Sequence, residues 1–283
     1  MPLVRITLLT SLAMLAFAGN SLLCRMALKH TEIDAASFTS IRLLSGAIAL
    51  WLIVQLQGGA IAKAGRWSAA FALFVYAACF SIAYISLPAG TGALLLFGAV
   101  QVTMIGYGLY SGERLQMLQS LGLLLALAGL VGLLLPGLSA PPWQGSVLML
   151  GAGIAWGVYS LLGKRVKNPT QATAGNFLRA VPFTLGFSLI YLPNLSWDSA
   201  GIFYAVASGA IASGIGYAIW YRALPDLQAT QAATVQLSVP ILAAVGAILF
   251  LSEPMTLRLG LAAIAILGGI SLVIGQRNSS QQT

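Results

Sequence analysis

Ten long apolar runs, separated by short polar stretches, limit what this chain of 283 residues can fold into. A helix needs about 20 predominantly apolar residues to cross a bilayer, and each run has about that length. The alternating pattern of membrane-barrel strands is absent, and no stretch between the runs is long enough for a soluble domain. We therefore expect an all-α integral membrane protein with ten transmembrane helices, at roughly 6–24, 35–56, 68–87, 89–110, 117–135, 145–163, 172–191, 200–221, 230–251 and 256–274.

The composition agrees with this expectation. Only 7% of the residues are charged and 59% are apolar, whereas a soluble domain is about 25% charged. So few charges cannot cover a water-exposed surface, which excludes soluble α/β enzymes, disordered chains and nucleic-acid binders despite the net charge of +8. Two cysteines and one histidine offer neither a disulfide framework nor a metal-ligand cluster. We expect no metal, no cofactor and no nucleic-acid partner, and membrane lipid around the protein.

The lysines and arginines predict the orientation. With the N-terminus inside, nine lie in inner segments and three in outer ones, so the positive-inside rule places both termini in the cytoplasm of a cell inner or plasma membrane. The inner set is Arg5, Lys63, Arg66, Arg114, Lys164, Arg165, Lys167, Arg222 and Arg277, and the outer set is Arg25, Lys29 and Arg258.

The first run also fits a second interpretation. Arg5, the apolar run and Ala16-Phe17-Ala18 resemble a cleavable signal peptide. Its removal would leave nine helices. An internal repeat favours a retained helix, because the repeat needs this segment as the partner of the sixth run.

The repeat is visible as a recurring Tyr-x-x-Leu-Pro motif. Tyr84-Ile85-Ser86-Leu87-Pro88 returns 137 residues later as Tyr221-Arg222-Ala223-Leu224-Pro225, and Arg42 and Arg179 are separated by the same interval. Three further pairs follow at intervals of 138 to 140 residues: Gly19 with Gly157, Glu113 with Glu253, and Gly129 with Gly269.

These intervals predict two five-helix repeats, at 1–138 and 143–276, joined through a proline-rich stretch. Because five is odd, the second repeat must enter the membrane inverted relative to the first. Inverted repeats are typical of secondary transporters, in which two related halves expose one central site to either face.

Several motifs carry a resemblance to a known family. Gly112-Glu113-Arg114 and Ser252-Glu253-Pro254 each precede a glycine-rich run, and Trp156-Gly157 stands in the sixth. With these motifs the chain resembles the ten-helix EamA-type branch of the drug/metabolite transporter superfamily over essentially its whole length. Within that branch it looks most like the YddG-type aromatic amino-acid exporters. It departs at Ala18-Gly19, where the family often has Trp-Gly.

A set of aromatic and polar residues falls near the middle of the predicted bilayer. Tryptophan and tyrosine favour membrane interfaces, so a mid-depth position indicates either a central cavity or packing against protein. For the amides, interhelical hydrogen bonds are the alternative to a binding role. The candidate substrate-binding residues are Phe17, Asn20, Tyr76, Gln101, Trp156, Tyr159, Gln236 and Ser238.

Arg42 and Arg179 lie inside the second and seventh runs. An intramembrane arginine is costly unless it is paired or reaches the interface. Each guanidinium could bond helix-end carbonyls, or each could contact a substrate carboxylate, and we include both among the substrate-binding candidates.

None of the six acidic residues falls at mid-depth. Glu113 and Glu253 precede the fifth and tenth runs, where a negative charge favours the start of a helix. A buried carboxylate is the usual proton carrier and the usual partner of a cationic drug, so its absence favours neutral or zwitterionic substrates.

The sequence therefore predicts alternating-access export of small amphipathic metabolites, above all aromatic or bulky apolar amino acids, without a strict proton requirement. The main alternative is a proton-coupled exporter of other metabolites or drugs. An intramembrane enzyme or a channel is less favoured, because no catalytic motif and no filter-like loop is visible.

Overall fold

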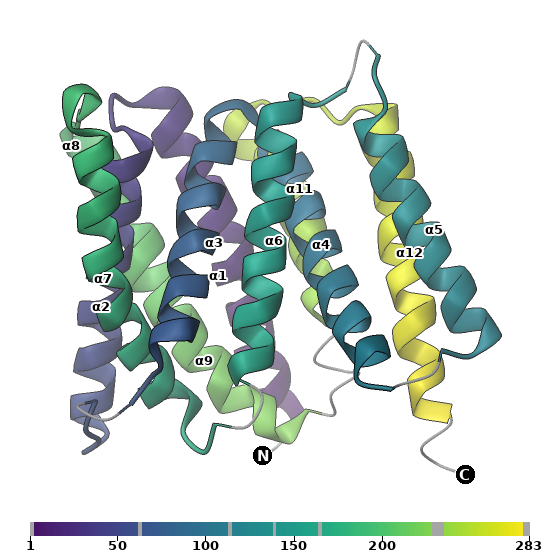
Figure 1. The fold of residues 1–283 in the computed structure, drawn as a ribbon, viewed down its shortest axis with the longest axis horizontal. Coiled ribbons are helices and arrows are strands. Elements are labelled where there is room, and N and C mark those ends of the chain that lie inside the picture. Colours follow the sequence, from purple (N-terminus) through teal and green to yellow (C-terminus); the bar gives the residue numbers. More distant parts are fainter. Residues whose placement is uncertain are drawn as a thin grey trace.

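The structure is a computed structural model that describes residues 3–61, 64–112, 115–137, 140–163, 166–227 and 235–279. Throughout these residues the chain forms helices and connections, without a strand. The helices stand side by side and alternate in direction, and both chain ends lie at one end of the bundle (Figure 1). We call this the terminal end, and the other the opposite end.

The first half contains α1 (Leu3–His30), α2 (Ala35–Leu56), α3 (Trp67–Ser86), α4 (Ala89–Tyr110) and α5 (Met117–Leu134). The second half begins with α6 (Trp143–Gly163), α7 (Pro169–Ile190) and the 3-10 turn η1 (Leu192–Asn194). One continuous rod follows, made of α8 (Ser199–Val206), the π-helical η2 (Ala207–Ile215), α9 (Gly216–Ala223) and the 3-10 turn η3 (Leu224–Asp226). It ends with α11 (Ser238–Leu251) and α12 (Leu257–Ser279).

The helix boundaries follow the apolar runs closely. Seven of the described helices are long and apolar enough to cross a membrane, namely α1 to α6 and the rod from α8 to η3. The described parts of α7, α11 and α12 are not both long and apolar enough to meet this criterion, and α11 has only 14 described residues. An all-helical chain of the membrane type is thus confirmed for the described residues, whereas ten crossings remain a prediction.

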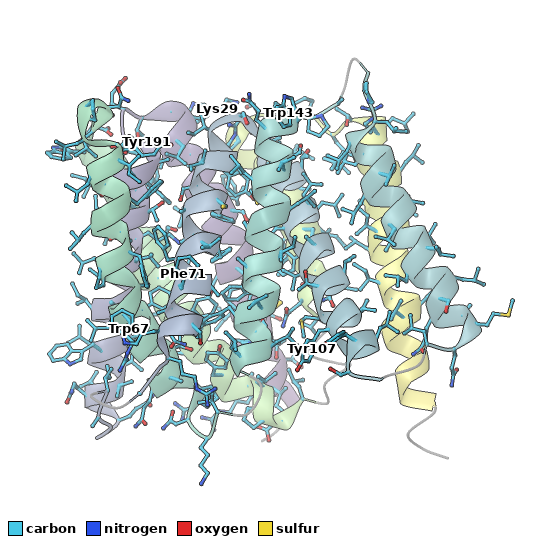
Figure 2. The ribbon with its side chains drawn as sticks, viewed as in Figure 1. Lys29, Trp67, Phe71, Tyr107, Trp143 and Tyr191 are labelled. Atoms are coloured by element: carbon cyan, nitrogen blue, oxygen red, sulfur yellow. The ribbon has the colours of Figure 1, made fainter. Side chains whose placement is uncertain are left out.

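Aromatic residues lie near both ends of the bundle. Trp67 and Tyr107 lie at the terminal end, and Trp143 and Tyr191 lie with Lys29 at the opposite end (Figure 2). Between them the outer surface carries many exposed leucines and isoleucines, such as Leu124 and Ile264. Apolar sides between aromatic belts are typical of membrane proteins.

The helices pack in pairs that relate the two halves. α2 lies against α7, and α5 lies against α12. α3 and α4 both pack on α6, while α9 and α11 both pack on α1. Of the described helices, α1 packs against the most segments of the other half, namely α8, η2, α9 and α11, so it lies at the centre of the contact between the two halves.

Several residues used in the sequence predictions lie outside the described residues. They are Lys63, Glu113, Arg114, Lys164 and Arg165.

Candidate functional site

A cavity of about 730 Å³ runs from the middle of the bundle to the terminal end. Its walls come from α1, α3, α4, α6, α7 and α9. At the terminal end it reaches the exposed residues Arg66, Lys167 and Asn168, in the α2–α3 and α6–α7 connections. The volume falls within the range of about 300–1,000 Å³ that is usual for small-molecule sites.

Seven of the ten candidate residues line this cavity. They come from five separate helical segments, so the fold brings together residues that are distant in the sequence. The seven are Phe17, Asn20, Tyr76, Gln101, Trp156, Tyr159 and Gln236.

The other three candidates lie elsewhere. Ser238 donates from its Oγ to the carbonyl of Val235, 2.7 Å away, and is no part of the cavity wall. The guanidinium of Arg179 donates to the carbonyls of Ala64 and Gly175, which fits the carbonyl-bonding alternative. Arg42 lies directly behind the wall, in contact with Tyr76.

Aromatic rings form one continuous group in the cavity wall. The ring of Trp156 stacks on Tyr159, with centroids 5.2 Å apart, and on Tyr217, with centroids 5.3 Å apart. The ring of Tyr76 is tilted against it at 4.9 Å. Ring faces in such groups attract further rings by offset or edge-on contact, so the wall suits an aromatic or flat apolar solute.

Sequence reasoning missed Tyr217 and its neighbour Trp220, which both belong to α9 and line the cavity. A weak signal was available. Tyr217 precedes Tyr221, the first residue of the second Tyr-x-x-Leu-Pro motif, by one helical turn, so the two share a helix face.

A polar chain crosses the inner end of the cavity. Ser208 donates from its Oγ to Oδ1 of Asn20 at 2.7 Å, and Asn20 donates from its Nδ2 to the hydroxyl of Tyr76 at 3.3 Å. Arg42 donates from Nη2 to the same hydroxyl at 3.0 Å. Helices α1, α2, α3 and η2 are therefore joined by hydrogen bonds at mid-depth.

Arg42 is only 1% exposed and lies beside the rings of Phe80 and Tyr76, with centroids 4.8 and 5.2 Å from its Cζ. Its Nε and Nη1 have no hydrogen-bond partner among the described residues. Within the same residues, no carboxylate forms an ion pair with it. Ring faces compensate a buried cation only in part, so a full positive charge stands behind the cavity wall.

A second polar group lies nearer the terminal end. Tyr159 donates from its hydroxyl to Oγ1 of Thr173 at 3.3 Å, and Asn176 donates from its Nδ2 to the same hydroxyl at 3.4 Å. Oδ1 of Asn176 accepts the backbone N–H of Arg66 at 2.8 Å. These bonds join α6, α7 and the α2–α3 connection beside the mouth of the cavity.

At the opposite end of the bundle, Arg25 of α1 forms a buried ion pair with Glu253, in the α11–α12 connection. Sequence reasoning expected Glu253 to serve the helix that follows it. Instead, its Oε2 accepts the N–H of Ala89, the first residue of α4, at 2.7 Å. The preference of a carboxylate for a helix N-terminus thus holds, but for a different helix.

The described part of the chain contains no group of three or more histidine, cysteine, aspartate or glutamate side chains that could hold a metal ion. The cavity wall offers ring faces, hydroxyls and amides, with Arg66 and Lys167 at the mouth and the buried cation of Arg42 behind the wall.

Comparison with known proteins gives one family match. Residues 143–275 match the model of the EamA-like transporter family. An uncharacterized protein of Pseudomonas aeruginosa, PA1977, is 58% identical over 98% of this chain and 97% of its own length.

More distant relatives have names that state a function. The threonine/homoserine exporter RhtA of Salmonella typhimurium is 27% identical over 46% of this chain and 44% of its own length. A probable amino-acid metabolite efflux pump of the same species is 25% identical over 65% of this chain and 67% of its own. One solved crystal structure shares the fold, with a TM-score of 0.68 over 95% of this chain and 96% of that one, at 19% identity.

Proposed function

We propose that this chain, an EamA-like transporter of the drug/metabolite transporter superfamily, exports aromatic or bulky apolar amino acids. The observation that carries this proposal is the group of stacked rings in the cavity wall, around Trp156. Two distant relatives, one named for the export of threonine and homoserine and one for the efflux of amino-acid metabolites, support amino-acid export in general. The large aromatic wall favours bulky side chains over small ones.

Alternating access is the mechanism that we propose. The packing of α3 and α4 on α6 corresponds to the packing of α9 and α11 on α1, as expected if 1–138 and 143–276 are inverted repeats. The family-model match over 143–275 supports the second of these boundaries. Two such halves can rock about one central site and expose it to either face.

In this proposal the terminal end faces the cytoplasm, so substrate enters the cavity from the side on which it is made. Among the described side chains, Arg5, Arg66, Lys167 and Arg222 lie at this end, which the positive-inside rule associates with the cytoplasm. The Arg25–Glu253 ion pair then closes the outer end, and it must break before substrate can leave.

The proposed transport mechanism includes no obligatory proton transfer. Among the described residues that line the cavity there is no carboxylate and no histidine. A zwitterion carries its own charges and needs no proton exchange to balance a buried one.

Flux measured in proteoliposomes tests the proposal. Labelled phenylalanine or tryptophan should move down its concentration gradient without a pH gradient, saturably and with preference for one enantiomer. Labelled lysine and a sugar phosphate are the comparison solutes. Flux only under an imposed pH gradient would reject the coupling, and carriage of phosphates or cations in place of amino acids would reject the substrate class. Unsaturable flux would indicate a channel.

A further inference from the structure

The hydroxyl of Tyr76 can donate one hydrogen bond for which the described residues offer no acceptor. Its oxygen accepts from Nη2 of Arg42 at 3.0 Å and from Nδ2 of Asn20 at 3.3 Å. A phenol oxygen has two acceptor positions and one O–H to donate, so both acceptor positions are filled. The O–H itself finds no acceptor among the residues that the structure describes, although Tyr76 is buried in the cavity wall.

The groups around this hydroxyl favour a negatively charged partner. A guanidinium stays protonated when it is buried, so Arg42 keeps its charge behind Tyr76. Its two unbonded nitrogens and the absence of an ion pair to a described carboxylate leave that charge uncompensated by the described protein. A hydrogen bond from a donor polarised by a cation is strongest when the acceptor is itself an anion.

We propose that this inner end of the cavity is an anion subsite, which binds the carboxylate of the substrate. Tyr76 donates its O–H to a carboxylate oxygen, and Arg42 supplies the compensating charge from behind without leaving its buried position. The proposal rests on the proposed function and narrows it, because it makes a carboxylate a requirement.

The subsite and the aromatic wall are adjacent. The rings of Tyr76 and Trp156 lie 4.9 Å apart, so one small molecule can place a carboxylate at the first and a ring against the second. An aromatic amino acid has both groups a few bonds apart. An aromatic amine without a carboxylate would bring an ammonium towards Arg42 and would be repelled. The accepted class is therefore aromatic carboxylates, including amino acids, and excludes cationic aromatic drugs.

Matched ligands test the subsite on the purified full-length protein, by isothermal titration calorimetry in detergent. Phenylalanine is compared with phenylalaninamide, and phenylacetate with phenylethylamine, since each pair differs at the carboxylate. We expect each carboxylate to bind at least about tenfold more tightly than its partner. In Tyr76→Phe, which keeps the ring and leaves Arg42 in place, that ratio should fall severalfold, because the hydrogen bond to the carboxylate is lost. Tyr107→Phe, which removes a hydroxyl from the outer surface, should leave it unchanged.

Equal affinity within both pairs, or a ratio that is unchanged in Tyr76→Phe, would overturn the anion subsite, and so would a failure of all four compounds to bind. A failure of the proposed transport function can be distinguished from a failure of the subsite. If the carboxylates bind with the expected preference but proteoliposomes show no amino-acid flux, the subsite stands and export is rejected. If flux occurs without preference for the carboxylate, export stands and the subsite is rejected.

Discussion

Arg25 and Glu253 form an ion pair in which Nε and Oε1 are 2.9 Å apart, although 228 residues separate them in the chain. Nη1 of Arg25 also donates to the carbonyls of Tyr84 and Ile85, at 2.8 and 2.9 Å, at the end of α3. The carboxylate of Glu253 accepts the first N–H of α4. One buried pair therefore holds α1, the α3–α4 corner and the α11–α12 connection together.

This pair predicts a large loss of stability in Arg25→Ala. The substitution leaves the buried carboxylate of Glu253 without its counter-charge, and breaking a buried ion pair in this way costs about 3–5 kcal/mol. The free energy of unfolding of the detergent-solubilised protein should fall by that order, measured by denaturant titration.

Two further variants test whether the loss of stability comes from the buried ion pair itself. Glu253→Gln keeps an acceptor for the N–H of Ala89 and should lose less than Arg25→Ala. Arg258→Ala removes a partly exposed arginine near the same end, whose guanidinium bonds only the carbonyl of Leu135 among the described residues, and should change stability by less than about 1 kcal/mol. Equal losses of unfolding free energy in Arg25→Ala and Arg258→Ala would show that the ion pair stabilises the protein no more than the Arg258 side chain does.

The proposed sidedness predicts opposite labelling of two lysine positions. Lys167 lies at the mouth of the cavity and Lys29 lies at the opposite end, and both side chains are exposed. Each is replaced singly by cysteine in a background that lacks Cys24 and Cys79. In intact cells a membrane-impermeant thiol reagent should label Lys29→Cys and spare Lys167→Cys. Inside-out vesicles should give the reverse, and labelling of both from one side would refute the orientation.

Some of the site could be predicted because depth in the membrane follows from position within an apolar run. The sequence predicts Trp156 and Tyr76 at mid-depth, and the structure places both in the wall of one cavity. Depth does not give the direction in which a side chain points. Ser238 was expected at mid-depth as well, yet it bonds the carbonyl of Val235 in its own segment.

Two other features are harder to predict from the sequence, for a different reason. Tyr217 follows η2, and a π-helical stretch shifts the register of every later side chain relative to an α-helix. The partner of Arg25 lies in the other half of the chain, and no local pattern identifies a contact over that separation.

Gly209 of η2 packs so closely against α2 that even an alanine at this position should destabilise the protein. A Cβ at this position would fall well inside contact distance of the backbone carbonyl of Arg42 and of the Oγ of Ser45, so Gly209→Ala must push α2 away from η2. We expect a loss of about 1–3 kcal/mol in the free energy of unfolding, as is usual for overpacking. Gly151→Ala is the matched control, because a Cβ there meets no atom within 4 Å. Its effect should be neutral or stabilising by up to about 1 kcal/mol, since alanine favours helix more than glycine does.

Trp156 gives the most direct test of the aromatic wall. Trp156→Ala removes the ring at the centre of the aromatic wall, which stacks on Tyr159 and Tyr217 and contacts Tyr76. A bound substrate ring then loses its partner in the wall, and such a contact contributes about 0.5–1.5 kcal/mol. The KM for an aromatic amino acid in proteoliposomes should therefore rise by up to about tenfold. Trp156→Phe, which retains one ring, should recover part of this loss. Trp51→Ala removes a tryptophan that is 48% exposed on the outer surface of α2 and should leave KM unchanged. A KM that is unaltered in Trp156→Ala would assign Trp156 to packing alone, and the proposal would then lose the observation that carries it.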